Sequence, residues 1–370
     1  MARLSSLSLT NFRSYSTADL SGFHPRFVAF IGANGMGKTN LLEAISLLSP
    51  GKGLRGASVS DMARVNSNAP WGVSAQLKTE SGDILLGTGG DDLLSRRAVY
   101  IQGVKAKSQT ELADYIRAVW LTPQMDRLFL DPAATRRKFL DRLVFTYDTA
   151  HAGRMRRYET ALSNRSRLLK DGQQSGAWID SLEAQMAESA SAIAASRVDF
   201  ILKLQAEIDL YKDDNFPQAR LELDGDTEKY VHSKPSLQIE DELKTAWRNA
   251  RVFDALQGGS SIGVHRTDLN VFFADKNMPA HLSSTGEQKF LLIGIILAHA
   301  AFIARDHGAP PLILLDEVAA HLDEGRRCAL YQKLYNLGGQ IFLTGTDMAL
   351  FDALPEGQKF HVSAGGQITL

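Results

Sequence analysis

Apolar and polar positions follow two different periods along this chain and predict two kinds of element. Near the N-terminus "LSSLSLTNF" alternates with a period of two, which is typical of a strand. Between Trp71 and about Gly103, short alternating runs separated by "SGD" and "GTGG" predict an antiparallel meander. From about Ala133 to Tyr211 the period is helical, and "KDGQQSG" divides this stretch into the two long helices of an antiparallel hairpin. Sustained heptads are not observed, so the pattern favours a packed helical lobe over a long coiled coil.

Strand patterns return toward the C-terminus. After an acidic, polar region from Asp209 to Glu242, "SSIGVHRTDLNVFF" predicts a hairpin, and "PLILLDEV" and "GQIFLTGTD" predict buried strands. Near the other end, "RFVAFIGANGMGKTNLLEAISLL" predicts a strand, a glycine loop and an amphipathic helix. The expected fold is therefore α/β, with a head built from both ends of the chain and an inserted α-helical lobe. The expected boundaries are residues 1–120 and 251–370 for the head and 121–250 for the lobe.

Composition narrows the class of protein but does not identify it. The chain has 370 residues, 44% apolar content and a formal net charge of -1, so any nucleic-acid contact must use a local basic patch. The only cysteine, Cys328, cannot form an internal disulfide, which favours a reducing compartment, and its simplest interpretation is a small buried hydrophobe. The longest apolar run, "FLLIGIILAHAAFIA", has about 15 residues and is too short to span a bilayer. We expect a cytoplasmic protein with no membrane contact.

The segment "GANGMGKT", residues 32–39, has the spacing G-x-x-x-x-G-K-[ST] of a phosphate-binding loop, and it follows a predicted strand and precedes a predicted helix. Glycines allow backbone amides to wrap a β-phosphate, while Lys38 reaches the β- and γ-phosphates and the Thr39 hydroxyl binds Mg²⁺. The loop therefore predicts an ATP site. Its expected nucleotide-binding residues are Gly32, Asn34, Gly35, Gly37, Lys38, Thr39 and Asn40.

The segment "LILLDE", residues 312–317, is an apolar strand that ends in two carboxylates. Asp316 is expected to hold Mg²⁺, and Glu317 to orient and deprotonate the attacking water. A strand ending in Asp-Glu is weak evidence alone. After a phosphate-binding loop, in this order, it predicts the catalytic half of a nucleotide hydrolase.

In "HLSSTGEQKF", small polar residues and a glycine precede an apolar run, as at a helix N-terminus whose free amides attract an anion. A Ser-x-Gly helix start about 30 residues before an Asp-Glu strand resembles the ABC-type ATPases. The resemblance implies a P-loop head with a mixed core sheet plus an antiparallel β meander. It also implies that this helix caps the γ-phosphate of ATP held by a second subunit, which gives a head-to-tail homodimer. Ser284 and Gly286 match the motif, and Glu287 replaces the usual glutamine.

The same resemblance assigns roles to three loop residues. Asp323 stands where the family has its D-loop, which makes it a candidate for contact across the dimer. Gln124, in "LTPQMD", stands where a Q-loop would contact nucleotide and Mg²⁺. Thr346, in "FLTGTD", stands where many ABC proteins have a histidine, which implies slow turnover or a subfamily without it. Asp323 and Gln124 are equally compatible with ordinary surface loops.

The order of "LSLTNFRSY", "GANGMGKTNLLEAI", "LTPQMDRLFLDPAATRRKFLD", "GVHRTDL" and "LSSTGEQK" resembles the bacterial RecF family of DNA replication and repair proteins over most of the chain. The chain departs from the family pattern at "GTGGDD" and at Val264, where a proline is expected before the histidine. The resemblance implies a slow, DNA-stimulated ATPase that dimerises on ATP. It also implies binding to duplex DNA or single-strand/duplex junctions, action with RecR and RecO to load RecA on gaps, and support of SOS induction. The head of this family resembles that of the SMC proteins without their long coiled coil.

The distribution of charge along the chain gives separate support for DNA binding. Residues 136–170 contain ten Lys or Arg and three acids, a local charge of +7 in a nearly neutral chain. Arginines suit phosphate because the guanidinium is bidentate and always charged. The candidate DNA-binding residues are Arg136, Arg137, Lys138, Arg154, Arg156 and Arg157. The alternative is a solvated helix face paired with acids elsewhere.

The N-terminal Arg13, in "NFRSY", is by resemblance a candidate for contact with nucleotide or the dimer seam, with a surface arginine as the alternative. The helix that begins at "SSTGEQ" is called the signature helix below. His265 and Arg266 lie just before it, and the same two interpretations apply to them.

Two rival functions predict features that this sequence lacks. A transporter ATPase subunit predicts a shorter spacing between the P-loop and the Ser-x-Gly helix start, a histidine at position 346, and an apolar docking groove for a membrane partner. This sequence instead has a long helical insert and Thr346. An ATPase with a nuclease module predicts a further acidic domain after the head. A nucleotide-gated scaffold with negligible hydrolysis remains open, because Glu317 favours hydrolysis while Thr346 disfavours fast turnover.

Overall fold

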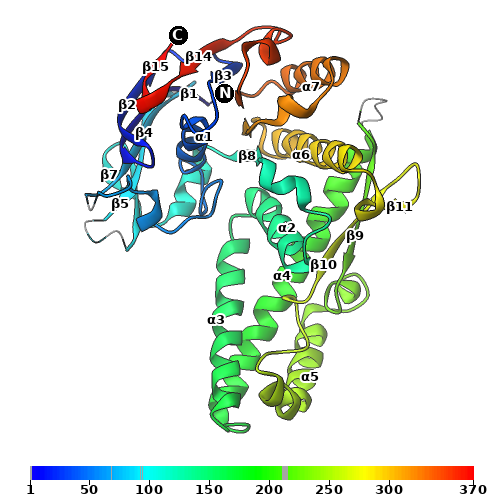
Figure 1. Cartoon of the computed structure of the whole chain (residues 1–370). Coiled ribbons are helices and arrows are strands. Elements are labelled where there is room, and N and C mark those ends of the chain that lie inside the picture. Colours follow the sequence, from blue (N-terminus) through cyan, green and yellow to red (C-terminus); the bar gives the residue numbers. More distant parts are fainter. Residues whose placement is uncertain (1, 68, 92, 94, 211–215) are drawn as a thin grey trace. The chain divides into compact units, whose positions relative to one another are not determined.

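The computed structural model describes residues 2–67, 69–91, 93, 95–210 and 216–370, and Figure 1 shows its elements, coloured from the N-terminus to the C-terminus. The chain divides into two compact units. The first unit combines Met1–Met125 with Ile296–Leu370, and the second is Asp126–Ile295. Helix α6 (Thr285–His307) begins in the second unit and ends in the first.

The first unit contains an antiparallel sheet with strand order β2-β1-β4-β5-β6-β7. The predicted meander between residues 71 and 103 is confirmed, and the N-terminal hairpin extends it because β1 pairs with both β2 and β4. Along β1 the buried positions Leu4, Leu7 and Leu9 face the core. The strands are β1 (Arg3–Phe12), β2 (Tyr15–Ser21), β4 (Gly72–Thr79), β5 (Gly82–Gly90), β6 (Arg97–Ile101) and β7 (Val104–Lys105).

A second, mainly parallel sheet has the order β15-β14-β3-β13-β12-β8, in which β14 pairs with β15 antiparallel and the other neighbours pair parallel. All five residues of the central strand β3 are buried, as expected for a parallel strand covered on both faces. The sheet joins strands from both ends of the chain, as predicted. These strands are β3 (Phe27–Ile31), β8 (Ala118–Leu121), β12 (Leu312–Leu315), β13 (Ile341–Gly345), β14 (Gln358–Val362) and β15 (Ile368–Thr369).

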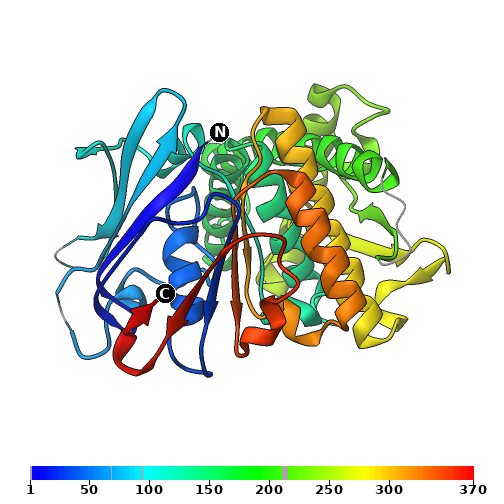
Figure 2. The ribbon, with the colours of Figure 1, turned by 90° about the horizontal axis from the view of Figure 1, so that it is seen from above.

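Helix α1 (Lys38–Ser46) lies between these two sheets (Figure 2). Its Leu41, Leu42 and Ile45 are fully buried in one apolar cluster that also contains Leu7 of β1 and Phe342 of β13. On the other face of the parallel sheet, Tyr331 of α7 (Glu324–Leu337) packs edge-on against Phe27, with 6.3 Å between ring centroids. The two-sided packing fixes the carboxyl ends of the parallel strands, where the site lies.

The second unit is a helical lobe with a small sheet. Helices α3 (His151–Lys170) and α4 (Ala177–Leu210) form the predicted hairpin, and α2 (Ala133–Tyr147) and α5 (Ser236–Gln257) complete the set (Figure 1). The core of the lobe gathers Tyr158, Met186, Ile193 and Trp247. The sheet has the order β11-β10-β9 and consists of β9 (Ala219–Asp224), β10 (Asp268–Phe273) and β11 (Met278–Pro279).

The structure differs from the sequence prediction in two parts of the lobe. Residues 236–257 form α5, although the acidic composition from Asp209 to Glu242 predicts a polar region that overlaps its start. The predicted hairpin in "SSIGVHRTDLNVFF" is wrong, because only Asp268–Phe273 is a strand and it pairs with β9 and β11. The preceding segment is held by side-chain hydrogen bonds, such as Ser260 Oγ to the Ile262 carbonyl oxygen (3.0 Å).

The compact units also differ from the predicted boundaries. The lobe runs from residue 126 to 295 instead of 121 to 250, because α5 packs on α4 and α3, and β9 and β10 pack on α4 and α2. Short 3-10 helices complete the fold at Ser60–Met62, Gln109–Asp114, Pro123–Arg127, Glu228–Tyr230, Ala280–Leu282, Val318–His321, Met348–Phe351 and Ala364–Gly366.

Candidate nucleotide-binding site

The glycine loop connects β3 to α1 and needs glycine at two positions for steric reasons. A Cβ on Gly32 would collide with the carbonyl oxygen of Val362. Gly37 has φ 102°, and a Cβ there would lie 2.8 Å from the hydroxyl oxygens of both Ser14 and Tyr15. At these two positions the backbone therefore lies too close to its neighbours for a side chain.

Lys38 is the first residue of α1 and is buried. Its Nζ donates to the carbonyl oxygens of Gly32 (2.7 Å) and Ala33 (2.9 Å) within its own loop. Burial lowers the pKa of Lys38, while the nearby charges of Glu317 and Asp316 oppose that shift. The ammonium thus lies inside the loop that a phosphate chain would occupy.

The P-loop and the Asp-Glu strand meet at Thr39 and Asp316. The Thr39 hydroxyl donates to both carboxylate oxygens of Asp316, at 2.9 and 3.0 Å, across 277 residues of chain. Asp316 follows β12 directly, and its amide donates to the carbonyl oxygen of Leu121 at the end of β8 (2.9 Å). A hydroxyl and a carboxylate side by side are the hard oxygen donors that Mg²⁺ prefers, so this pair fits the ion.

Glu317 has a left-handed backbone, with φ 54°. Its amide donates to Thr344 Oγ1 (2.9 Å), and that hydroxyl donates to Asp316 Oδ1 (2.7 Å). Thr344 is buried on β13, and sequence reasoning missed it. The available signal was a hydroxyl residue inside the otherwise apolar strand "IFLTG" beside the Asp-Glu strand.

Gln124 and Thr346 follow the two strands that flank β12 in the sheet, β8 and β13. Both side chains are exposed at the carboxyl edge of the parallel strands. The structure therefore brings both positions to the edge that carries Asp316 and Glu317.

Arg13 lies beside the helix of the P-loop. Its Nε and Nη2 donate to the two carboxylate oxygens of Glu43, at 2.8 and 2.5 Å, and its Nη1 donates to the Asp61 carbonyl oxygen (2.6 Å). Glu43 is buried in α1 and also accepts from Arg55 (2.9 Å). Arg55 in turn donates to the side chain of Asn40 (2.8 Å). Arg13 is therefore engaged by a buried carboxylate instead of extending freely from the surface.

In the lobe, Ser284 precedes helix α6 and forms a reciprocal cap with Glu287. Glu287 Oε2 accepts from the Ser284 amide (3.0 Å) and hydroxyl (2.9 Å), while its Oε1 lies 2.5 Å from Lys276 Nζ. Lys276, with the two donors on Ser284, lowers the pKa of Glu287 to about 2. The expectation of free amides at this helix start needs correction, because the Ser284 amide is occupied by the Glu287 carboxylate. Gly286 is exposed in the first turn.

Asp323 caps helix α7, and its Oδ1 accepts from the Arg326 amide at 2.9 Å. Its side chain is 61% exposed. Asp323 therefore has a local structural role together with an exposed carboxylate.

The candidate DNA-binding cations of the lobe separate into two groups. Arg136 pairs with Asp268 through two bonds of 2.8 and 2.5 Å, and Arg154 pairs with Asp148. Arg137 donates to the Thr267 carbonyl oxygen (2.8 Å), and burial lowers its pKa. These three half-buried side chains have partners within the lobe, so their assignment to DNA stays a prediction. The remaining candidates, Lys138, Arg156 and Arg157, are exposed.

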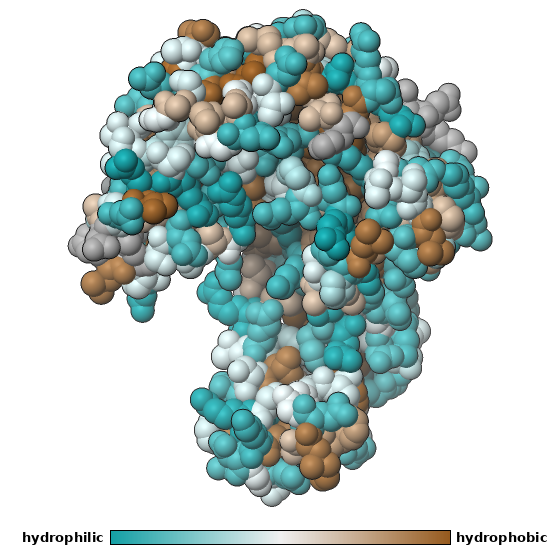
Figure 3. All heavy atoms as spheres, viewed as in Figure 1, coloured by the Kyte–Doolittle hydropathy of each residue, from teal (hydrophilic) through white to brown (hydrophobic). Residues whose placement is uncertain are grey.

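One further cation of the basic segment is excluded from any surface role. Arg165 is fully buried and bonds to Glu183 (2.8 Å), Asp254 (2.7 Å) and the Trp247 carbonyl oxygen (2.8 Å). Arg167 and Lys170, on the same helix, are exposed, and the visible face of the lobe is mainly hydrophilic (Figure 3).

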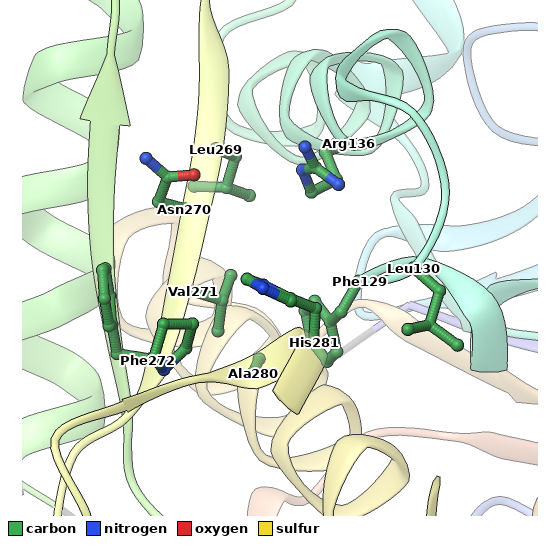
Figure 4. A pocket seen from close by; sticks show the side chains of 10 residues that line it. Phe129, Leu130, Arg136, Leu269, Asn270, Val271, Phe272, Ala280 and His281 are labelled. Atoms are coloured by element: carbon green, nitrogen blue, oxygen red, sulfur yellow. The ribbon is translucent and has the colours of Figure 1, made fainter. Parts of the chain in front are cut away.

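A pocket of about 470 Å³ in the lobe lies beside the segment that precedes Ser284. Arg136 and His281 face it from α2 and from the 3-10 turn before the signature (Figure 4). Because Asp268 already neutralises Arg136, the pocket is mainly apolar in character. Its lining consists of Phe129, Leu130, Arg136, Leu269, Asn270, Val271, Phe272, Pro279, Ala280 and His281.

Within the described part of the chain, one helix, Thr285–His307, has the length and hydropathy of a membrane span. Its most apolar 18-residue window is 78% buried, as in the core helix of a globular protein. The helix is therefore weak evidence for a membrane.

Comparisons with known proteins agree on one family. A family model described as the RecF/RecN/SMC N terminal domain matches residues 3–359. The chain is 47% identical over 361 residues to a DNA replication and repair protein RecF of Mesorhizobium japonicum, with 96% of this chain and 95% of the relative covered. It is 45% identical over 368 residues to the same protein of Agrobacterium fabrum, with 98% and 97% covered.

Solved structures confirm the predicted fold. The structure of the recombination mediator protein RecF-ATPrS in the RecFOR pathway has a TM-score of 0.87 at 23% identity, covering 99% of this chain and 97% of that one. An SMC head domain from Pyrococcus furiosus has a TM-score of 0.55 at 16% identity, covering 100% and 96%. At these identities the likeness concerns the fold alone. Together with the family model and the close relatives, it shows that the chain belongs to the bacterial RecF family and has the ABC-type ATPase head that this family shares with the SMC proteins.

Proposed function

We propose that this protein binds and hydrolyses ATP and uses ATP to control DNA binding in replication and recombinational repair. The observation that carries the proposal is the Thr39–Asp316 contact, which unites the P-loop with the Asp-Glu strand at one sheet edge. Membership of the RecF family, whose curated relatives are named as DNA replication and repair proteins, supports the biological role.

Each residue of the site has a chemical role in this proposal. The loop amides and Lys38 would hold the β- and γ-phosphates, and Thr39 and Asp316 would hold Mg²⁺, with Gln124 at the same edge. When bound, the ion would neutralise the charge that develops on the phosphates. Glu317 would accept a proton from the attacking water. Arg13 and Asn40 would shape the nucleotide side of the loop through Glu43 and Arg55.

The signature and D-loop residues complete the site of a second copy in this proposal. Ser284 and Gly286 would face the γ-phosphate bound by a partner, and Asp323 would contact the same seam. Two ATP molecules would then join two heads into a homodimer. The dimer would act in the cytoplasm with RecR and RecO to load RecA on gapped DNA and support SOS induction. The name of the RecFOR pathway in a structural relative supports RecO and RecR as partners.

A basic stripe on α3 is the surface that we assign to DNA. It consists of Arg156, Arg157, Arg167 and Lys170, with Lys138 exposed on α2. Positions 156 to 170 extend over about 21 Å at 1.5 Å per residue, enough to follow several backbone phosphates. Contacts of this kind would tolerate different sequences and weaken with salt.

A nucleotide-gated scaffold with negligible hydrolysis is the second candidate, and Thr346 is the observation that favours it. The residue is exposed at the sheet edge where a histidine stands in many ABC proteins. Under this alternative, ATP would control assembly and Glu317 would contribute little to turnover.

The deciding experiment measures the mass in solution of Glu317→Gln protein with and without Mg-ATP, at fixed protein concentration and salt. Blocked hydrolysis should trap an ATP-dependent dimer, and Ser284→Arg in the same background should stay monomeric. Wild-type protein that hydrolyses ATP faster than Glu317→Gln supports the enzyme, while equal, negligible rates with an intact dimer favour the scaffold. A monomer at saturating ATP, with no gain in DNA affinity, contradicts the proposal.

A further inference from the structure

Thr344 is a buried hydroxyl at the catalytic edge to which the motifs assign no role. Its strand β13 lies between β3, which precedes the P-loop, and β12, which precedes Asp316. Thr344 is 1% exposed to solvent. A parallel strand with neighbours on both sides holds its side chains in one orientation, so Thr344 is well placed to fix groups on β12.

One hydroxyl satisfies two groups at once. Thr344 Oγ1 donates its single proton to Asp316 Oδ1 (2.7 Å) and accepts the amide proton of Glu317 (2.9 Å). The first bond restricts the rotation of the Asp316 carboxylate. The second bond holds the backbone of Glu317, whose φ of 54° is unfavourable for a residue with a Cβ.

The Thr39 hydroxyl also contacts Asp316, but from the P-loop side. If Thr39 turns toward a metal ion, its bonds to Asp316 weaken and Thr344 keeps the carboxylate in place. The Thr344 hydroxyl therefore connects the metal-binding carboxylate to the backbone that carries Glu317.

We propose that Thr344 is a positioning residue for ATP hydrolysis, which orients Asp316 and Glu317 together through its hydroxyl. This inference rests on the proposed function of the site. Thr344 touches neither substrate nor water in this role. Its loss should therefore reduce kcat more than it weakens ATP binding, because the P-loop makes most of the phosphate contacts.

The test compares Thr344→Val, which keeps the shape and removes the hydroxyl, with Thr344→Ser, which keeps the hydroxyl. Thr88→Val is the matched control, because Thr88 is also buried, donates to the Ala98 carbonyl oxygen (2.8 Å) and accepts from Arg97 (2.7 Å), all within the meander. We expect Thr344→Val to lower kcat by about tenfold or more while the Kd for ATP changes by less than about threefold. Thr344→Ser should recover most of kcat, and Thr88→Val should keep it.

Crystal structures of the full-length variants without nucleotide give a readout that is independent of hydrolysis. In Thr344→Val, the Asp316 carboxylate should rotate or Glu317 should leave its left-handed conformation, and Thr344→Ser should retain both. The inference is overturned if both residues stay in place, if kcat is unchanged in Thr344→Val, or if Thr88→Val loses as much. If wild-type protein hydrolyses no ATP, the proposed function fails, and the crystal structures still decide whether Thr344 positions the pair.

Discussion

Glu287 caps the start of the signature helix: its Oε2 accepts hydrogen bonds from the amide and the hydroxyl of Ser284, while its Oε1 pairs with the ammonium of Lys276. In the proposed dimer, the γ-phosphate of the partner's ATP approaches this same serine. The carboxylate therefore competes with the phosphate for the same donors and repels it. A glutamine at this position can still accept from Ser284 but carries no charge.

We predict that Glu287→Gln strengthens ATP-dependent dimerisation several-fold in the Glu317→Gln background. The measurement is sedimentation over a range of protein concentrations, with and without Mg-ATP. Lys276→Gln is the control, since it removes the neutralising cation and should weaken the dimer. Weaker dimerisation of Glu287→Gln than of the parent protein would show that the carboxylate assists closure.

The P-loop, the Asp-Glu strand and their meeting at one sheet edge could be predicted, because each motif has a fixed spacing and follows an apolar strand. Thr344 could not, because its role depends on the lateral order of strands, which places β13 beside β12 across 28 residues of chain. Sequence shows that a threonine interrupts an apolar run but not which carboxylate it meets.

The basic segment shows a second limit of sequence reasoning. A count of cations treats Arg156 and Arg165 alike, although the first is exposed and the second is buried between Glu183 and Asp254. The acids that neutralise Arg165 come from α4 and α5, and their proximity is set by the packing of three helices. Only the tertiary fold separates the cations that hold the lobe together from those that remain for a ligand.

Arg165 is expected to be essential for the stability of the lobe. Arg165→Met would leave the buried carboxylate of Asp254 without its cation, and breaking a buried pair in this way costs about 3 kcal/mol or more in free energy of unfolding. Urea unfolding followed by circular dichroism measures the change. Arg167→Met, on the exposed side of the same helix, should change the free energy of unfolding by less than about 0.5 kcal/mol. Equal values for the two variants would exclude the assigned role.

His265 makes the stability of the lobe depend on pH. Its Nδ1 lies 2.7 Å from the Tyr158 hydroxyl and its Nε2 lies 2.9 Å from the Ser260 carbonyl oxygen, an arrangement that suits the neutral ring with the proton on Nε2. Burial, with Arg137 and Arg266 nearby, lowers the pKa of His265. The unfolded chain therefore binds a proton below about pH 6.5 that the folded chain does not bind, so acid favours unfolding.

We predict that the stabilising contribution of His265 is complete above pH 7 and declines as the pH falls through about 6.5. The measurement compares the free energy of unfolding of wild-type protein and His265→Gln at several values between pH 5 and pH 8. The difference between the two proteins should shrink toward acid pH. A difference that is constant over this range, or that grows toward acid pH, would contradict the assignment of a lowered pKa.

The exposed stripe on α3 predicts how DNA affinity responds to salt. Replacing Arg156, Arg157 and Arg167 together by glutamine removes three phosphate contacts, so the slope of log Kd against log salt should fall by about 3. The affinity for different sequences should fall equally, because backbone contacts carry no sequence information. The measurement is fluorescence anisotropy on duplex DNA with saturating Mg-ATP, at several salt concentrations.

A charge-matched control replaces three lysines elsewhere in the lobe by glutamine. Lys203, Lys229 and Lys244 are each paired with a nearby aspartate, so their charges are already neutralised locally. This control should leave the salt slope nearly unchanged, although the net charge changes by the same amount. If both triple variants lower the slope equally, the protein responds to its total charge and not to a stripe on α3. If neither triple variant lowers the slope, the DNA-binding surface lies outside α3, and the cations of this helix form a solvated face.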